Sequence, residues 1–143
     1  MKQEPGEPKT QVAALPIRRE KTGELRVLLI TSRETRRWII PKGWPMKGRT
    51  NAEAAAQEAL EEAGVEGEVE KQAFGKYLYW KRGAARFELC EVLVHLLEVK
   101  RQLETWPEKS QRDARWFSVE DAADLVEEPG LTAVIASLGK RRG

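Results

Sequence analysis

Three carboxylates are crowded into one short stretch of the chain, at Glu58, Glu61 and Glu62. Their spacings of three and four residues place the side chains within about 100° of arc if the stretch is helical. Like charges so placed cost roughly a few tenths of a kcal/mol per pair, and acids near a helix C-terminus oppose the helix dipole. No Lys or Arg lies between Thr50 and Glu70 to offset them. A divalent cation such as Mg²⁺, which prefers oxygen ligands, would remove this cost.

The loop before these acids favours a metal site over the alternative, an ordinary solvated helix face. Residues 42–49 bring together Lys42, Gly43, Lys47, Gly48 and Arg49. Glycines and cations directly before a helix N-terminus suit phosphate binding. An anion-binding loop beside a cation-binding face predicts a phosphorylated substrate.

The carboxylates must be positioned by a helix that begins at Thr50 and ends at Gly64. Thr50 and Glu53 have the spacing of a capping box, and Gly64 suits a left-handed C-cap. A stripe of mostly small residues at helical spacing predicts close packing on a neighbouring element, with the carboxylates directed away from it. The stripe consists of Ala52, Ala55, Ala56, Ala59, Leu60 and Ala63.

The rest of the chain alternates short β-forming runs with turns. Residues 11–18 are predicted as an edge strand because they contain Pro16, and residues 86–99 as a central strand because they are long and apolar. Further strands are predicted at residues 26–32, 38–40, 77–80 and 114–117, and a second helix is predicted to begin at Ser118. This irregular mixture favours an α/β or α+β layered domain over a strict βαβ repeat.

Composition narrows the functional classes. The 143 residues, 41% hydrophobic and 34% charged, fit one globular domain. No apolar stretch approaches the roughly 20 residues of a membrane span, and the first residues lack the apolar centre of a signal peptide. One cysteine, Cys90, allows no internal disulfide and no Cys-type metal cluster, so a cytoplasmic location is expected. The net charge of +2 makes nucleic acid an unlikely bulk partner but leaves a local basic patch open.

Residues 43–65 resemble the signature of the Nudix hydrolase family, G-x5-E-x7-R-E-U-x-E-E-x-G-U, in which U is aliphatic. Gly43 supplies the first glycine. The second half is matched in register by Glu58, Ala59, Glu61, Glu62, Gly64 and Val65. The segments RRWIIPKGW and DARWFSVEDAADLV are similar to the family's flanking elements, so the resemblance covers residues 11–138. It is strongest toward the branch that handles diphosphoinositol and diadenosine polyphosphates.

Two positions depart from that signature. Arg49 stands where the family has Glu, and Gln57 stands where it has Arg. In the family these two side chains form an ion pair between the loop and the helix, whereas here the Arg49 guanidinium is able to donate to the Gln57 amide oxygen. The metal-site glutamates are unchanged, but the altered pair favours a second hypothesis, a domain that binds or senses a phosphorylated ligand with weakened catalysis.

The resemblance implies an α/β Nudix fold, a mixed β-sheet core sandwiched between helices. The domain is expected at residues 11–138, with a flexible tail at residues 1–10 and a basic tail at residues 139–143. The implied reaction is metal-dependent hydrolysis of a phosphoanhydride, with Mg²⁺ or Mn²⁺ held by Glu58, Glu61, Glu62 and Gly43. Glu61 and Glu58 are the candidate catalytic residues, and Glu61 is the favoured general base.

Cations near this helix predict a substrate with several phosphates. The candidate substrate-binding residues are Arg18, Arg33, Arg37, Lys42 and Lys47. The expected partner is a small-molecule polyphosphate of the diadenosine or diphosphoinositol type, with no membrane partner. A third hypothesis, an RNA 5′-end pyrophosphohydrolase, is favoured by the basic residues around the loop. The sequence leaves the oligomeric state open.

Overall fold

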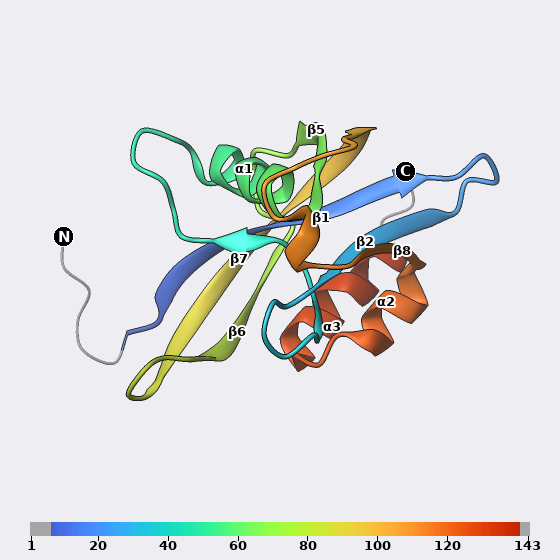
Figure 1. Cartoon of the computed structure of the whole chain (residues 1–143). Coiled ribbons are helices and arrows are strands. Elements are labelled where there is room, and N and C mark those ends of the chain that lie inside the picture. Colours follow the sequence, from blue (N-terminus) through green and yellow to red (C-terminus); the bar gives the residue numbers. More distant parts are fainter. Residues whose placement is uncertain (1–6, 141–143) are drawn as a thin grey trace.

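A mixed β-sheet organises the chain in the computed structural model, which describes residues 7–140. Its strands are β1 (Lys9–Arg19), β2 (Leu25–Thr31), β3 (Trp38–Ile39), β4 (Lys42–Gly43), β5 (Val65–Val69), β6 (Gly75–Arg82), β7 (Phe87–Gln102) and β8 (Ala114–Ser118). The helices are α1 (Asn51–Ala63), α2 (Val119–Leu125) and α3 (Pro129–Ala136), with 3₁₀ turns at Lys109–Gln111 and Ser137–Lys140. Helix α1 covers one side of the sheet, and α2 and α3 cover the other (Figure 1).

Strands β1 and β7 form the axis of the sheet and run parallel, in register from Lys9 opposite Cys90 to Ile17 opposite Glu98. Strands β2 and β4 pair antiparallel with the edge of β1 that faces away from β7. Strands β5 and β6 pair antiparallel with the edge of β7 that faces away from β1. Strands β3 and β8 both pair with β2. The prediction that the long apolar run is a central strand is therefore confirmed.

The prediction that residues 11–18 form an edge strand is wrong, because β1 has partners on both sides. Pro16 is tolerated because the second neighbour of β1 changes at this point. Strand β4 pairs with Val12 and Ala13, and β2 pairs only from Ile17 onward. The Ala14 N–H donates to the Pro41 carbonyl at 3.0 Å. Backbone N–H groups alternate between the two edges of a strand, so the nitrogen of Pro16 lies on the same edge as that of Ala14. It falls between the end of the pairing with β4 and the start of the pairing with β2, where no hydrogen-bond donor is needed.

Two hydrophobic cores separate the sheet from its helices. One lies under α2 and α3 and includes Leu15, Leu96 and Ile135. The other lies under α1 and includes Val12, Ala14 and Leu97. A strand buried on both faces presents apolar residues at successive positions, which explains the continuous apolar runs of β1 and β7. The expected α/β class, a mixed sheet sandwiched between helices, is confirmed.

Helix α1 has the predicted ends. Thr50 accepts from the Glu53 N–H at 3.1 Å, the Glu53 carboxylate accepts from the Thr50 N–H at 2.8 Å, and Gly64 is left-handed at φ 68°. The predicted stripe is displaced, however, because Ala56 and Leu60 are only partly buried. The buried arc consists of Ala52, Ala54, Ala55, Ala59, Glu62 and Ala63. The helix is thus rotated so that one of its glutamates faces inward.

Strand β1 begins two residues before the predicted domain boundary, at Lys9. Most of the predicted N-terminal tail, residues 1–6, and the end of the predicted basic tail, residues 141–143, lie outside the described residues. Within residues 7–140, no helix has the length and apolar character that a membrane crossing requires.

Candidate active site

The Glu58 carboxylate lies directly against the backbone of β4. A Cβ added to Gly43 would lie 2.3 Å from Oε2 of Glu58 and 2.5 Å from its Cδ. Both distances are far shorter than an ordinary van der Waals contact. Any side chain at position 43 would therefore force Glu58 to move. The first glycine of the signature and Glu58, the first of its glutamates that this chain retains, are therefore in direct contact.

Glu62 lies beside Glu58 and is buried, with 6% of its surface exposed. Its Oε1 is 3.4 Å from the backbone N–H of Lys42. Burial, together with a hydrogen bond to Glu58, raises the pKa of Glu62 to about 8. Burial also raises the pKa of Glu58, while the hydrogen bond to Glu62 lowers it. The two carboxyl groups therefore share a proton at neutral pH unless a cation takes its place.

Two residues from far along the chain complete this cluster, Arg112 and Glu108. The Arg112 Nη2 lies 3.8 Å from Oε1 of Glu62, and its Nε donates to Oε1 of Glu108 at 2.8 Å. Its Nη1 donates to the carbonyl of Thr31 at 3.1 Å. The Arg112 charge lowers the pKa of Glu58 and Glu62, whereas the Glu108 charge raises both. The site thus holds a third carboxylate and a buried guanidinium.

Residues 103–112 reach the site because they dock on the C-terminal end of α1. The Leu103 N–H donates to the carbonyl of Gly64 at 2.8 Å, and the Glu108 N–H to that of Glu61 at 3.0 Å. These bonds satisfy carbonyls that a helix C-terminus leaves unpaired. The Trp106 ring fills the space where a Gly64 side chain would stand. The sequence reasoning missed Glu108 and Arg112, because no local pattern links this segment to the helix.

Glu61, the favoured base and a predicted metal ligand, is engaged by a side chain of its own helix. Its Oε2 accepts from Nε2 of Gln57 at 2.6 Å. The predicted bond from Arg49 to Gln57 is not the one formed. The Arg49 charge instead interacts with the Glu53 carboxylate. Hydrogen bonds from Thr50 are the main reason that the pKa of Glu53 is lowered, and the Arg49 charge lowers it further. The substitution of Gln for the family's Arg therefore ties Glu61 to its own helix.

The donors present fit a divalent cation that brings further oxygen ligands of its own. Glu58, Glu62 and the β4 backbone at Gly43 converge, and the two carboxyls share a proton that a cation would displace. Among residues 7–140, no three His, Cys, Asp or Glu side chains are arranged to hold a metal unaided. Mg²⁺ commonly uses one or two carboxylates and completes its shell with water and substrate phosphates. A site with two carboxylate ligands matches that coordination preference.

One of the predicted substrate-binding cations, Lys42, contacts Glu62 through its backbone, and a second, Arg37, shares a hollow with Lys42 on the side of α2 and α3. Lys42 and Arg37 line a small hollow of about 30 Å³ together with Tyr77, Tyr79 and Glu128. The Lys42 Nζ lies 5.1 Å from the centre of the Tyr79 ring. Burial lowers the pKa of Lys42, and Glu62 raises it. Lys42 therefore contacts Glu62 through its backbone N–H and also lines the hollow.

The other three predicted cations lie elsewhere. The Arg18 guanidinium stacks on Trp116, 4.3 Å from the ring centre, and β1 places it six residues beyond Val12, the residue opposite Gly43. That separation is about 20 Å along a strand. Arg33 donates to Oε1 of Gln111 at 3.3 Å. Lys47 is exposed in the loop.

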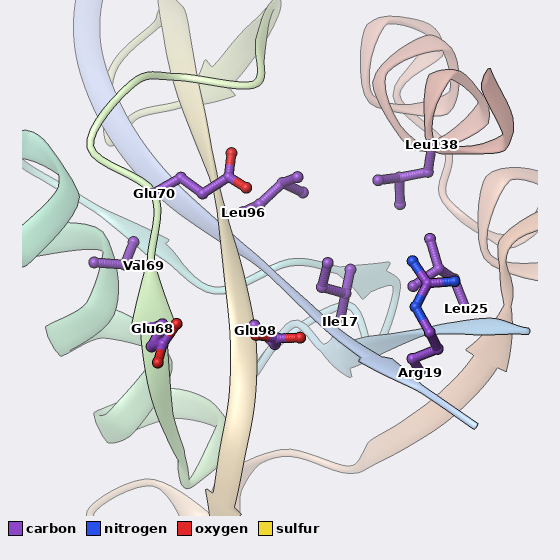
Figure 2. A pocket seen from close by; sticks show the side chains of 9 residues that line it. All are labelled: Ile17, Arg19, Leu25, Glu68, Val69, Glu70, Leu96, Glu98 and Leu138. Carbon is purple, nitrogen blue, oxygen red and sulfur yellow. The ribbon is translucent and has the colours of Figure 1, made fainter. Parts of the chain in front are cut away.

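A larger hollow of about 300 Å³ has neither Glu58 nor Glu62 in its walls, and Figure 2 shows the side chains that line it. Its apolar walls include Ile17, Leu96 and Leu138, which belong to the α2 and α3 side of the sheet, whereas Glu58 and Glu62 come from α1. Two of its charged groups have partners nearby. Arg19 donates to the carbonyl of Gly23 at 2.8 Å, and Glu98 pairs with Lys100 at 3.0 Å. This hollow contributes nothing to the candidate active site.

Comparison with known proteins identifies the family of the whole domain. The model of the NUDIX domain matches residues 8–138. Nudix hydrolase 13, mitochondrial, from Arabidopsis thaliana is 34% identical over 109 residues, covering 71% of this chain and 54% of the relative. Diphosphoinositol polyphosphate phosphohydrolase 3-beta from Bos taurus is 32% identical over 126 residues, covering 83% and 70%. The chain spans about half the length of the first Arabidopsis relatives.

Solved structures share the fold at low sequence identity. A C. elegans Ap4A hydrolase in a binary complex superposes with a TM-score of 0.69 at 16% identity, covering 93% of this chain and 96% of that one. Likeness at this level of identity concerns the arrangement of the elements, including the sheet and its flanking helices.

Proposed function

Because this chain belongs to the Nudix hydrolase family, we propose that it hydrolyses a phosphoanhydride bond with the help of Mg²⁺ or Mn²⁺. The observation that carries the proposal is the hydrogen-bonded pair of carboxyls, the buried Glu62 and the half-buried Glu58, with Glu58 set against Gly43. Two carboxyls that must share a proton form a costly arrangement, which a divalent ion stabilises.

In this proposal Glu58, Glu62 and the Gly43 backbone hold the ion. When bound, it neutralises phosphate charge and lowers the pKa of water. Glu61 accepts a proton from the attacking water, since it is partly exposed and its carboxylate is oriented by Gln57. Arg112 keeps Glu62 in place and offsets negative charge, because it also binds Glu108 and the Thr31 carbonyl.

The proposed substrate is a polyphosphorylated small molecule, of the diadenosine polyphosphate or diphosphoinositol polyphosphate type. Two features support it. The backbone of Lys42 contacts Glu62, and Arg37 shares a hollow with Lys42. Relatives and structural neighbours carry the names diphosphoinositol polyphosphate phosphohydrolase and Ap4A hydrolase. Lys42 is the stronger candidate contact, because its backbone already touches Glu62. A cytoplasmic location stays a prediction.

A panel of phosphoanhydrides, assayed with and without Mg²⁺ or Mn²⁺ by phosphate release, tests this function. The panel contains diadenosine polyphosphates, a diphosphoinositol polyphosphate, nucleoside diphosphate sugars and 5′-triphosphorylated RNA. Metal-dependent turnover of one of the first two supports the proposal. Turnover of RNA alone would move the assignment to a 5′-end pyrophosphohydrolase.

The second candidate function, a domain that binds or senses a phosphorylated ligand, is favoured by one observation. Gln57 does not reach across to Arg49, so the loop lacks the tie to the helix that the family's ion pair provides. Tight binding of a panel compound without turnover, measured by calorimetry in the presence of Mg²⁺, would support this function and contradict the hydrolase.

A further inference from the structure

The hairpin formed by β6 and β7 exposes a large apolar surface that the candidate active site does not use. Leu78, Trp80 and Phe87 are 52%, 63% and 60% exposed. Along residues 7–140, only Trp44 and Leu125 are other large apolar side chains with comparable exposure. Contiguous apolar surface on a folded domain commonly marks a binding site.

These side chains share one face of the sheet because of the strand register. Trp80 pairs with Leu89, Arg82 with Phe87, and Leu78 with Glu91, so their side chains alternate onto a single side. We call Leu78, Trp80, Arg82, Phe87 and Leu89 the hairpin face. It lies on the same side of the sheet as α1, since Leu97, which shares its parity along β7, packs beneath that helix.

Helix α1 does not cover the hairpin face. The core under α1 takes Leu97 and Val99 from the far end of β7, whereas Phe87 and Leu89 lie at the start of that strand. The hairpin extends past the helices in the view of Figure 1. The exposed face is therefore a flat, two-stranded surface open to solvent.

Positive charge lies on and beside this face. Arg82 is on it and Arg86 follows in the adjoining turn, whereas Lys81 alternates onto the opposite face, where it pairs across the strands with Glu88. The two acids of the hairpin are already engaged, through ion pairs of Glu88 with Lys9 and of Glu91 with Lys76. The charge left over around the turn is positive, so a complementary partner is anionic.

The arrangement favours a single-stranded polynucleotide over two other occupants. A second copy pairing along the open edge of β6 would bring the cations of the two strands, Lys76, Lys81 and Arg82, close together. If the hairpin entered a membrane with its turn first, Gly83 and the cations of the turn would lie deeper than Trp80. In membrane proteins the aromatic residues usually lie at the interface and cations lie outside them, so this order is reversed. Aromatic rings on an exposed sheet, with cations around them, stack bases and pair with phosphates.

We propose that the hairpin face binds single-stranded RNA or DNA, with Trp80 and Phe87 stacking on bases and Arg82 and Arg86 contacting phosphates. This binding site is separate from the glutamate site and does not depend on the proposed hydrolysis. It is the local basic patch that the overall charge leaves open, and it predicts weak, salt-sensitive affinity without sequence preference.

Fluorescence anisotropy of a labelled 5′-hydroxyl oligouridine of about ten nucleotides tests the site. The 5′-hydroxyl end carries no phosphoanhydride, so the readout is independent of hydrolysis. We expect binding at about 50 mM salt that weakens as salt rises. Trp80→Ala and Phe87→Ala should each weaken binding at least about fivefold, while Trp80→Phe retains most of it. Leu125→Ala, which removes an exposed apolar side chain on α2, should have no effect.

Three results would overturn the proposal, provided that circular dichroism shows each variant to be folded. One is no binding at protein concentrations up to about 100 μM, the weak end of polynucleotide affinity. Another is binding that Trp80→Ala and Phe87→Ala leave unchanged. The third is a Trp80-dependent dimer in sedimentation velocity, or Trp80-dependent binding to phosphatidylserine vesicles, without oligonucleotide binding.

Discussion

Replacing Gly43 by Ala should disable the metal site while leaving the fold intact. The new Cβ would lie 2.3 Å from Oε2 of Glu58, whereas ordinary contacts begin near 3.4 Å. The carboxylate must therefore move by about 1 Å, a displacement that costs roughly a hundredfold in rate at a catalytic centre. The atoms that meet the Cβ belong to the flexible end of a side chain, and Gly43 has no positive φ. We therefore expect a change of less than about 1 kcal/mol in the free energy of unfolding.

The assays measure Mn²⁺ binding by electron paramagnetic resonance, metal-dependent phosphate release, and urea unfolding. Gly139→Ala is the matched control, since a Cβ there meets nothing within 4 Å and its φ is not positive. Adding Gly43→Ala to Glu58→Gln should cost little further affinity, because both changes act on the same carboxylate. If Gly43→Ala keeps its Mn²⁺ affinity and activity within about twofold, the contact between Gly43 and Glu58 has no role in metal binding and the reasoning fails.

Three further outcomes are expected. The pKa of Glu62 is raised to about 8 in the folded state, so without divalent metal the unfolding free energy falls as pH rises from about 4.5, the unfolded pKa, to 8; urea titrations should show this slope, and Glu62→Gln should flatten it. Arg112→Met should lower the unfolding free energy by about 2 to 4 kcal/mol, because it leaves Glu108 and the Thr31 carbonyl without a donor; a loss below about 0.5 kcal/mol in urea would contradict the buried pairing. Arg49→Glu combined with Gln57→Arg should raise the turnover number or leave it unchanged, since it restores the family's ion pair; a large loss in steady-state kinetics would mean that the bond from Gln57 to Glu61 is itself required.

Local chemistry in the sequence predicted the parts of the fold that local chemistry determines. The ends of α1 follow from Thr50, Glu53 and Gly64, whose caps form as expected. The central position of β7 follows from its length and apolar character. The edge assignment of β1 failed because the effect of Pro16 depends on which strand lies beside it, and that is set by the crossover from β4 to β2.

Only some of the residues of the candidate site could be predicted from the sequence. Glu58 and Gly43 were identified by type and spacing, but the rotation of α1 that buries Glu62 depends on packing against the sheet. Glu108 and Arg112 reach the site through hydrogen bonds to the end of α1, which no periodic pattern encodes. Of the five predicted substrate cations, only Lys42 contacts a site glutamate, and only Arg37 shares a hollow with it, since the reach of a side chain depends on strand order.

A Mn²⁺ titration of the wild-type chain, Glu58→Gln, Glu62→Gln and Glu53→Gln at pH 8 most directly tests whether the Glu58 and Glu62 carboxylates hold a divalent ion. Glu53→Gln is the control, because it removes the same charge from the same helix and a Gln at that position still supports the cap. We predict that Glu58→Gln and Glu62→Gln each weaken Mn²⁺ binding by more than about tenfold, while Glu53→Gln does not. Equal affinity in all four proteins would contradict the assignment of the site.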